Sequence, residues 1–196
     1  MTTRLRFALP QLGIVLLLFG VIAGAAPASA QTLGWTTLER DDLHFAIAFP
    51  GDQLPPEIAL RVADPQFVSI HDWPSAATQE TVRFAAYDLE DDDSTDAMLQ
   101  ALVRQRLLNA AAQAVGERAV VDAETPVTLQ GFAGIELRYH DSQWQYRSRI
   151  FVVRRFAKVF TTTVTTYPDR PFSADATKFE TSLQVVSQQS SVASLQ

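Results

Sequence analysis

The chain has 196 residues, and its 22 Asp and Glu residues outnumber its 16 Lys and Arg residues, which gives a formal net charge of −6. An acidic protein is a poor candidate for binding nucleic acid or anionic lipid, because both require a basic face. The sequence contains no cysteine, which excludes disulfides and a lipid-modified cysteine, so the fold must depend on its hydrophobic core.

The first thirty residues have the pattern of a secretory signal peptide. Arg4 and Arg6 precede an apolar run at 12–26, and small residues follow up to Ala30. This pattern predicts cleavage between Ala30 and Gln31 and export to the periplasm. The apolar run is about 15 residues long and a spanning helix needs roughly 20, so we expect no stable membrane span after cleavage. A secreted protein, or one anchored by an uncleaved signal, is the alternative.

The mature chain is expected to begin with an exposed lead at 31–40, from which Trp35 and Leu38 dock onto the core. Apolar residues then alternate strictly from Leu43 to Phe49, a pattern typical of a half-buried strand. Pro50 and the glycine after it end this strand. His44 falls on the face opposite the large apolar residues and is expected at the surface.

Two further strands, at 66–71 and 81–89, are expected on either side of a turn around Pro74. The one long helix is predicted at 95–115, with Gly116 after its last turn. Its apolar residues recur at spacings of three and four, which places one stripe against a sheet. The members of this stripe are Leu99, Val103, Leu107, Ala110 or Ala111, and Ala114.

The acidic run at 91–93 and Ser94 come directly before this helix. We interpret them as a helix cap, because an Asp or Ser side chain accepts hydrogen bonds from the first turn and negative charge there suits the helix dipole. A cation site is the weaker interpretation, since consecutive side chains on a loop do not converge on one ion.

The second half of the sequence predicts the strands around which the fold is organised. Two long strands rich in β-branched and aromatic residues are separated by a short basic turn at 154–157. A helix with Ser173 as its cap is expected to close the fold, followed by a polar tail. The expected strands are 119–123, 135–140, 146–153 and 158–167, and the helix is 173–183.

The order of these features resembles the PsbP/Mog1-like proteins, and more closely their small exported bacterial members. The resemblance covers the chain from about Trp35 to Val186 and is carried by the order of several short motifs. These are Phe49-Pro50-Gly51, the long helix, Gly131 to Gly134 before a strand, the aromatic hairpin, and Phe179 to Leu183. The chain departs from the pattern at Val153 to Phe156, where such relatives often carry glycine.

The resemblance implies a single α+β domain with a central, mainly antiparallel β-sheet flanked by α-helices. The expected organisation is a signal peptide at 1–30, the PsbP/Mog1-like domain at 31–186 and a polar tail at 187–196. The resemblance also implies that the protein binds a partner or assists assembly, and does not catalyse a reaction. We therefore expect a non-catalytic exported binding or accessory module of the cell envelope, with no cofactor and with an unknown envelope protein or anionic ligand as its partner.

Two His-Asp pairs offer an alternative function. His71 and Asp72 end one expected strand, and His140 and Asp141 end another. If the two strand ends were adjacent, these side chains would form a Zn²⁺ or Mn²⁺ site of a metal-binding protein or a metal-dependent enzyme. The simpler interpretation is that polarity returns where each strand ends.

The strongest candidate for a partner-binding surface is a cluster of basic residues in and around the central hairpin: Arg147, Arg149, Arg154, Arg155 and Lys158. In an acidic protein such a cluster concentrates positive potential, which favours a carboxylate-rich partner or an anionic glycan. The alternatives are pairing with the protein's own carboxylates and protection of an exposed edge strand. Thr161, Thr163 and Thr165 form a row of hydroxyls that we interpret as a half-exposed strand face and not as a ligand site.

Overall fold

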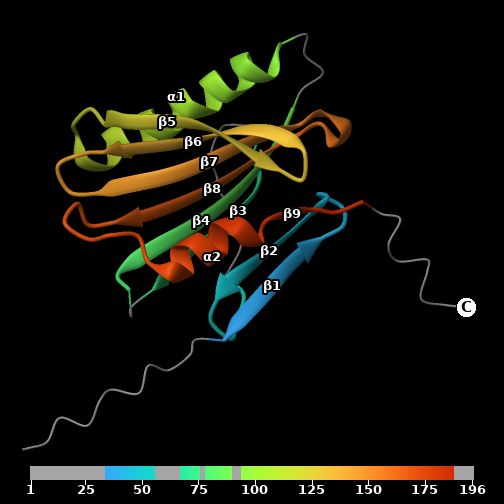
Figure 1. Cartoon of the computed structure of the whole chain (residues 1–196), viewed down its shortest axis with the longest axis horizontal. Coiled ribbons are helices and arrows are strands. Elements are labelled where there is room, and N and C mark those ends of the chain that lie inside the picture. The colour runs from blue at the N-terminus through green and yellow to red at the C-terminus, as the bar shows by residue number, and fades with distance from the viewer. Residues whose placement is uncertain (1–33, 56–66, 76–77, 90–93, 188–196) are drawn as a thin grey trace, which may run out of the picture. The chain divides into compact units, whose positions relative to one another are not determined.

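The hairpin predicted to organise the fold lies at the centre of the structure. β7 (Gln145–Val153) and β8 (Lys158–Thr166) pair antiparallel in the middle of a six-stranded sheet with the order β3–β4–β8–β7–β6–β5. This computed structural model describes residues 34–55, 67–75, 78–89 and 94–187 (Figure 1). Both central strands are without Gly and Pro, which suits strands that are paired along both edges.

The other described elements complete an α+β fold, which confirms the predicted fold class. The large sheet also contains β3 (Phe67–Ser75), β4 (Glu80–Asp88), β5 (Val120–Leu129) and β6 (Phe132–His140). A smaller sheet with the order β1–β2–β9 contains β1 (Trp35–Arg40), β2 (Phe45–Pro50) and β9 (Gln184–Val185). The helices are α1 (Asp96–Val115) and α2 (Ala174–Ser182), and the 3₁₀ turn η1 (Arg154–Phe156) joins β7 to β8.

The two faces of the large sheet are covered by different elements, as Figure 1 shows: α1 on one face, and α2 with the small sheet on the other. Successive residues of a strand point to opposite faces, so β4 contributes to both cores. Phe84 packs with Phe45 and Phe160 on the α2 side, whereas Ala85 packs with Leu99 and its neighbours on the α1 side. Burial of each such aromatic ring stabilises the fold by about 1.5–3 kcal/mol.

The expected exposed lead is a β-strand. β1 pairs antiparallel with β2, so that Leu38 lies opposite Ile47. Leu38 is buried and Trp35 packs against the same core, as the sequence predicted for these two side chains. Without β1, one edge of β2 would have backbone groups without partners. The polar residues of the expected lead do not indicate that it meets this requirement.

Two prolines lie inside strands, although Pro74 was expected in a turn between two strands. Pro74 is in β3 and Pro126 is in β5, and these are the two edge strands of the large sheet. A proline is tolerated at an edge because its missing N–H can face away from the neighbouring strand. β6 begins earlier than the predicted strand at 135–140, so Gly134 lies within it, where a larger residue would meet the Phe151 ring.

The helix boundaries agree with the sequence prediction, although one cap does not. The Thr95 hydroxyl caps α1 by accepting a hydrogen bond from the Met98 N–H, where an Asp or Ser was expected. Gly116 ends the helix in the left-handed conformation. Ser173 caps α2, as predicted.

Several expectations fall on residues outside those that the structure describes. They are the signal peptide at 1–30, the acidic run at 91–93 and most of the tail after 187. Among the described residues, no helix combines the length and the apolar character that crossing a membrane requires.

Candidate partner-binding site

The structure separates the five basic residues of the predicted cluster into two groups. Arg147 and Arg149 lie on the face of β7 that α2 covers, and the other three lie at the η1 end of the hairpin. β7 is an inner strand, so protection of an exposed edge does not explain its arginines. Pairing with the protein's own carboxylates occurs at four of the five residues.

Arg147 is part of a buried ion pair with Glu180 of α2. Its Nε donates a hydrogen bond of 2.8 Å to Oε1, and its Nη2 makes an ionic contact of 2.6 Å with Oε2. The Glu180 side chain is 0% exposed and that of Arg147 is 10% exposed. The guanidinium also lies over the Phe172 ring. Arg147 therefore fastens α2 to the sheet and is not accessible to a partner.

Arg149 connects two buried glutamates. Its Nε donates to Glu136 at 3.0 Å, and its Nη2 lies 3.8 Å from Glu180. Burial alone would raise the pKa of Glu136, but hydrogen bonds from Arg149 and Arg138 outweigh it and lower that pKa. For Glu180 burial outweighs the hydrogen bond from Arg147, so its pKa is raised. Both carboxylates contact Arg149, but the arginines offset the effect of burial on the pKa for Glu136 and not for Glu180.

Arg154 and Lys158 tie the hairpin turn to its surroundings. Arg154 donates hydrogen bonds to the Asp96 carboxylate and to the Ser94 carbonyl, just before and at the start of α1. Lys158 pairs with Asp88 at the end of β4. Both cations are therefore neutralised by carboxylates of the same chain.

Arg155 is the exception in the cluster. It is exposed, and its guanidinium carbon lies 4.8 Å from the centroid of the Phe132 ring and 4.6 Å from that of the Phe156 ring. Within the described part of the chain it has no carboxylate partner. Phe156 stacks in turn on His44, with centroids 3.9 Å apart and ring planes 10° apart. We call these four residues, Arg155, Phe132, Phe156 and His44, the Arg155 platform.

The platform can hold an anion. Contacts with aromatic faces attract the guanidinium and restrict its motion, and its N–H groups still form a planar fork that matches a carboxylate. Because no ion pair with a described residue has to be broken, an incoming carboxylate would gain a charge-assisted hydrogen bond at little cost.

The three rings of the platform were not identified from the sequence. Phe132 comes from the β5–β6 hairpin and not from the central one. His44 lies in the turn before β2 with a φ of 62°, and its buried Nδ1 has no hydrogen-bond partner among the described residues. Only Phe156 carried a signal, as an aromatic residue directly after two arginines.

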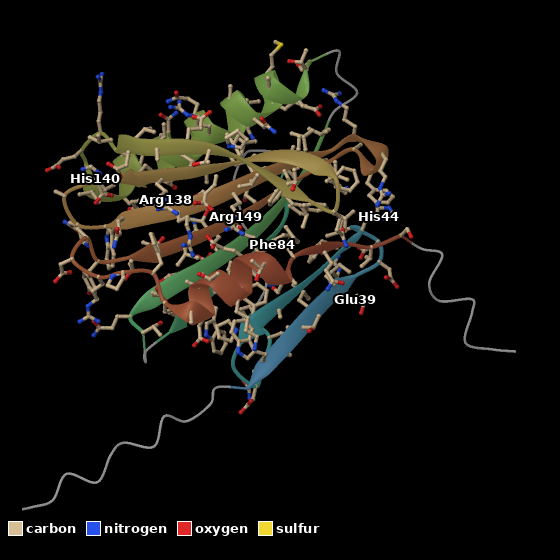
Figure 2. All side chains as sticks on the ribbon, in the orientation of Figure 1. Glu39, His44, Phe84, Arg138, His140 and Arg149 are labelled. Atoms are coloured by element: carbon tan, nitrogen blue, oxygen red, sulfur yellow. The ribbon has the colours of Figure 1, made fainter. Side chains whose placement is uncertain are left out.

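The two His-Asp pairs are not brought together. His71 is in β3 and His140 is in β6, four strand spacings apart in the sheet, which is about 19 Å. Figure 2 labels His140 and His44 and shows them at opposite ends of the strands, with Arg138 and Arg149 between them. No group of three or more metal-ligating residues is found in the described ranges. The condition for a joint metal site, adjacent strand ends, is therefore not met.

Each member of these pairs has a local partner instead. Asp72 accepts two hydrogen bonds from Arg83 on the neighbouring strand β4. His140 lies 2.8 Å from Asp122 of β5, and Asp141 accepts backbone hydrogen bonds in the turn before β7. His71 Nδ1 contacts the Pro55 carbonyl.

The threonine row lies on the face of β8 that α1 covers. Thr161 is 2% exposed and Thr163 is 6% exposed, so this face is more buried than the half-exposed surface that we expected. The Thr163 hydroxyl is 2.8 Å from that of Ser148 on β7. Thr161 and Thr163 are therefore interior, between α1 and the sheet, whereas Thr165 is half-buried.

Comparison with solved structures identifies the fold. The cyanobacterial PsbP (CyanoP) from Synechocystis sp. PCC 6803 is similar with a TM-score of 0.58 and 14% identity, over 83% of this chain and 98% of that one. This likeness shows a PsbP/Mog1-like fold, which confirms the resemblance seen in the sequence. At this identity the likeness shows the fold alone.

Two other solved structures are more distant. The Ran-binding protein Mog1p from Saccharomyces cerevisiae has a TM-score of 0.47 and 11% identity, over 79% of this chain and 97% of that one. The protein of unknown function PA94 from Pseudomonas aeruginosa has a TM-score of 0.38 and 17% identity, over 68% and 83%. No family model matches the sequence, and no curated protein matches it.

Proposed function

We propose that the protein is a non-catalytic binding module of the cell envelope, and that it binds an acidic segment of a partner protein through the Arg155 platform. One observation carries this proposal. Arg155 is exposed on two aromatic rings without a carboxylate partner in the described residues, whereas the other four cations of the cluster are paired internally.

The residue types of the platform support a role in protein binding. Arginine and aromatic residues are enriched among the residues that contribute most of the affinity at protein interfaces, and an aromatic ring combines a large contact area with few conformations to lose. The Phe156 and His44 rings are stacked and come from two different turns, so the surface under Arg155 is built before a partner arrives. A preformed surface lowers the entropy cost of binding.

The non-catalytic part of the proposal rests on how the ionisable side chains are used. Glu136 and Glu180 hold arginines, and His140 pairs with Asp122. Tyr139 and Tyr146 are kept protonated, because burial raises the pKa of both phenols. These groups stabilise the sheet and its covers, and each is already occupied by a neighbour.

Export is proposed from the sequence at 1–30. The pattern of basic, apolar and small residues there is that of a cleavable signal, which favours the periplasm over a secreted or anchored location. The test is intact-mass and N-terminal analysis of protein from the envelope fraction of cells that express the full chain. A mature terminus at Gln31 supports export, and recovery of the uncut chain from the cytoplasm contradicts it.

The binding proposal is tested with a defined acidic probe. A fluorescent peptide of alternating glutamate and serine is titrated with the purified mature protein at low and at physiological salt. We expect saturable binding that weakens with salt, because the contact is between charged groups. Arg155→Ala should reduce the affinity by about tenfold, the value of a charge-assisted hydrogen bond.

Arg170→Ala is the matched control. Arg170 is also an exposed arginine over an aromatic ring, that of Tyr167, but it follows β8 at the end opposite to η1. It should leave the affinity unchanged. An equal loss in both variants would mean that the peptide responds to net charge alone, and the absence of saturable binding would contradict the proposed site.

A further inference from the structure

A cavity of about 180 Å³ lies between the C-terminal half of α1 and the large sheet. It is at the end of the hairpin opposite to the Arg155 platform, since Thr165 near the end of β8 lines it. Sheet residues form its floor and helix residues form its roof. The lining residues of the floor are Thr81, Arg83, Tyr139, Tyr146, Thr163 and Thr165.

The floor is polar because of the strand register. Thr81, Thr165, Tyr146 and Tyr139 are successive partners across β4, β8, β7 and β6, and side chains of paired residues point to the same face. In the next row Arg83 lies opposite Thr163, which lies opposite Ser148. Hydroxyls therefore cover this part of the sheet, whereas the rest of the α1 face carries mostly apolar side chains.

The roof is apolar and short. Leu99 and Val103 in the first half of α1 reach the sheet and pack against its apolar residues. In the second half the helix presents Leu107 together with Ala110, Ala111 and Ala114, whose side chains end at Cβ. The helix therefore leaves a space above the hydroxyls that leucines at the same positions would fill.

Two hydroxyls of the floor are available. Those of Thr81 and Thr165 lie side by side in the register and make no hydrogen bond within the described residues. Thr163 is already bonded to Ser148, Tyr139 to Ser148, and Tyr146 to Asp141. A threonine hydroxyl both donates and accepts, so this pair can bind either type of polar group.

We infer that this cavity binds an uncharged six-membered ring compound that places its apolar face against the alanines and a hydrogen-bonding group on Thr81 and Thr165. The size fits, since a cavity of about 150 Å³ is sufficient for benzene. The chemistry fits as well, because an amphipathic ring matches one apolar wall and one hydroxyl wall, whereas a purely apolar ligand would leave the hydroxyls unbonded.

The electrostatics of the lining favour a neutral ligand. The Arg83 guanidinium is already held by both oxygens of Asp72, at 2.5 and 2.6 Å, so its charge is neutralised. Burial raises the pKa of Tyr139 to about 12, and burial with the Asp141 hydrogen bond raises the pKa of Tyr146, so both phenols stay uncharged at neutral pH. A charged ligand would lose its hydration without gaining a counter-charge.

The inference is tested by NMR titration of the isotope-labelled mature protein with phenol and with benzoate, which have the same ring but differ in charge. We expect phenol to shift the amide signals of Ala110, Ala114, Thr163 and Thr165 with a dissociation constant of about 1 mM. Benzoate should bind at least tenfold more weakly. Ala110→Leu, at an exposed helix position that tolerates leucine, should abolish the phenol shifts by filling the space.

Matched controls separate a ligand site from a general effect. Ala101→Leu makes the same change on α1 outside the cavity and should leave phenol binding intact. Thr165→Val removes an available hydroxyl and should weaken binding about fivefold, whereas Thr161→Val, in the same row but outside the lining, should not. Non-saturable shifts or an equal loss in both leucine variants would overturn the inference and leave a cavity without a specific ligand, and benzoate binding as tightly as phenol would overturn the preference for an uncharged ring.

Discussion

Arg147 in β7 and Arg155 in η1 belong to the same hairpin, but their guanidinium groups have different surroundings. Arg147 is buried between the sheet and α2, where it pairs with Glu180. Arg155 is exposed on the rings of Phe132 and Phe156. The contact with Glu180 therefore gives Arg147 a role in stability. Arg155 has no carboxylate partner among the described residues, which is the property that the proposed binding site uses.

The largest effect on stability is expected at the buried ion pair of Arg147 and Glu180. Arg147→Met should lower the free energy of unfolding by about 3–5 kcal/mol, because it leaves the buried Glu180 carboxyl without its main partner. Urea denaturation followed by tryptophan fluorescence measures the change. The double variant Arg147→Met with Glu180→Met should recover most of the loss, since two apolar side chains can replace a buried ion pair. A loss below about 1 kcal/mol in the single variant would show that Arg147 is not needed under α2.

The second effect on stability is expected at the Tyr139 phenol, which lies under α1. Burial raises the pKa of Tyr139 to about 12. Below pH 10 the phenol is protonated in the folded and unfolded states, so it adds no pH dependence. Between about pH 10 and 12 only the unfolded chain releases the proton, so the free energy of unfolding falls as pH rises, by up to about 2–3 kcal/mol. Denaturation at about pH 9 and pH 11 should show this fall, and Tyr139→Phe should reduce it. Tyr167→Phe, at an exposed tyrosine, should not reduce the fall. A fall of the same size in the wild type and in Tyr139→Phe would mean that Tyr139 does not cause it.

A smaller effect is expected in the turn that carries Arg155. Ala157 has a φ of 50°, in the left-handed region that non-glycine residues occupy at a cost of about 1–2 kcal/mol. Ala157→Gly should raise the free energy of unfolding by about 0.5–1 kcal/mol, after subtraction of the larger entropy of the unfolded glycine chain. Thermal denaturation would detect it, and a lower midpoint would mean that the alanine methyl packs better than its backbone strain costs.

The smallest effect on stability is expected at Arg155 itself. Arg155→Ala breaks no ion pair with a described residue, so the free energy of unfolding should change by no more than about 0.5 kcal/mol. Denaturation in parallel with Arg147→Met gives the contrast directly. A loss at Arg155 comparable with that at Arg147 would remove the distinction between the two arginines.

Most of the architecture follows from local patterns in the sequence. The alternation from Leu43 to Phe49, the hairpin and the Ser173 cap are each set by residues close together, and the structure contains all three. The positions of Pro74 and Pro126 inside strands could not be predicted, because a proline is tolerated only at a sheet edge and the edges are defined only by the topology.

The candidate site was predictable only in part. Arg155 was named with its four neighbours because they share a charge and a sequence region. Their separation depends on distant carboxylates such as Glu180, whose helix position gives no indication that it is buried against Arg147. Phe156 follows Arg155 directly in the sequence, but Phe132 and His44 come from other turns of the chain, so no spacing in the sequence connects them to Arg155.

The most direct test of the Arg155 platform is the affinity of the glutamate-serine peptide for Arg155→Lys. Lysine keeps the positive charge but has no planar fork to lie on two rings and bind a carboxylate with two N–H groups. We expect Arg155→Lys to lose nearly as much affinity as Arg155→Ala, with the stability of both variants unchanged. Wild-type affinity in the lysine variant would show that charge alone is read at this end of the hairpin, and would contradict the role of the aromatic platform.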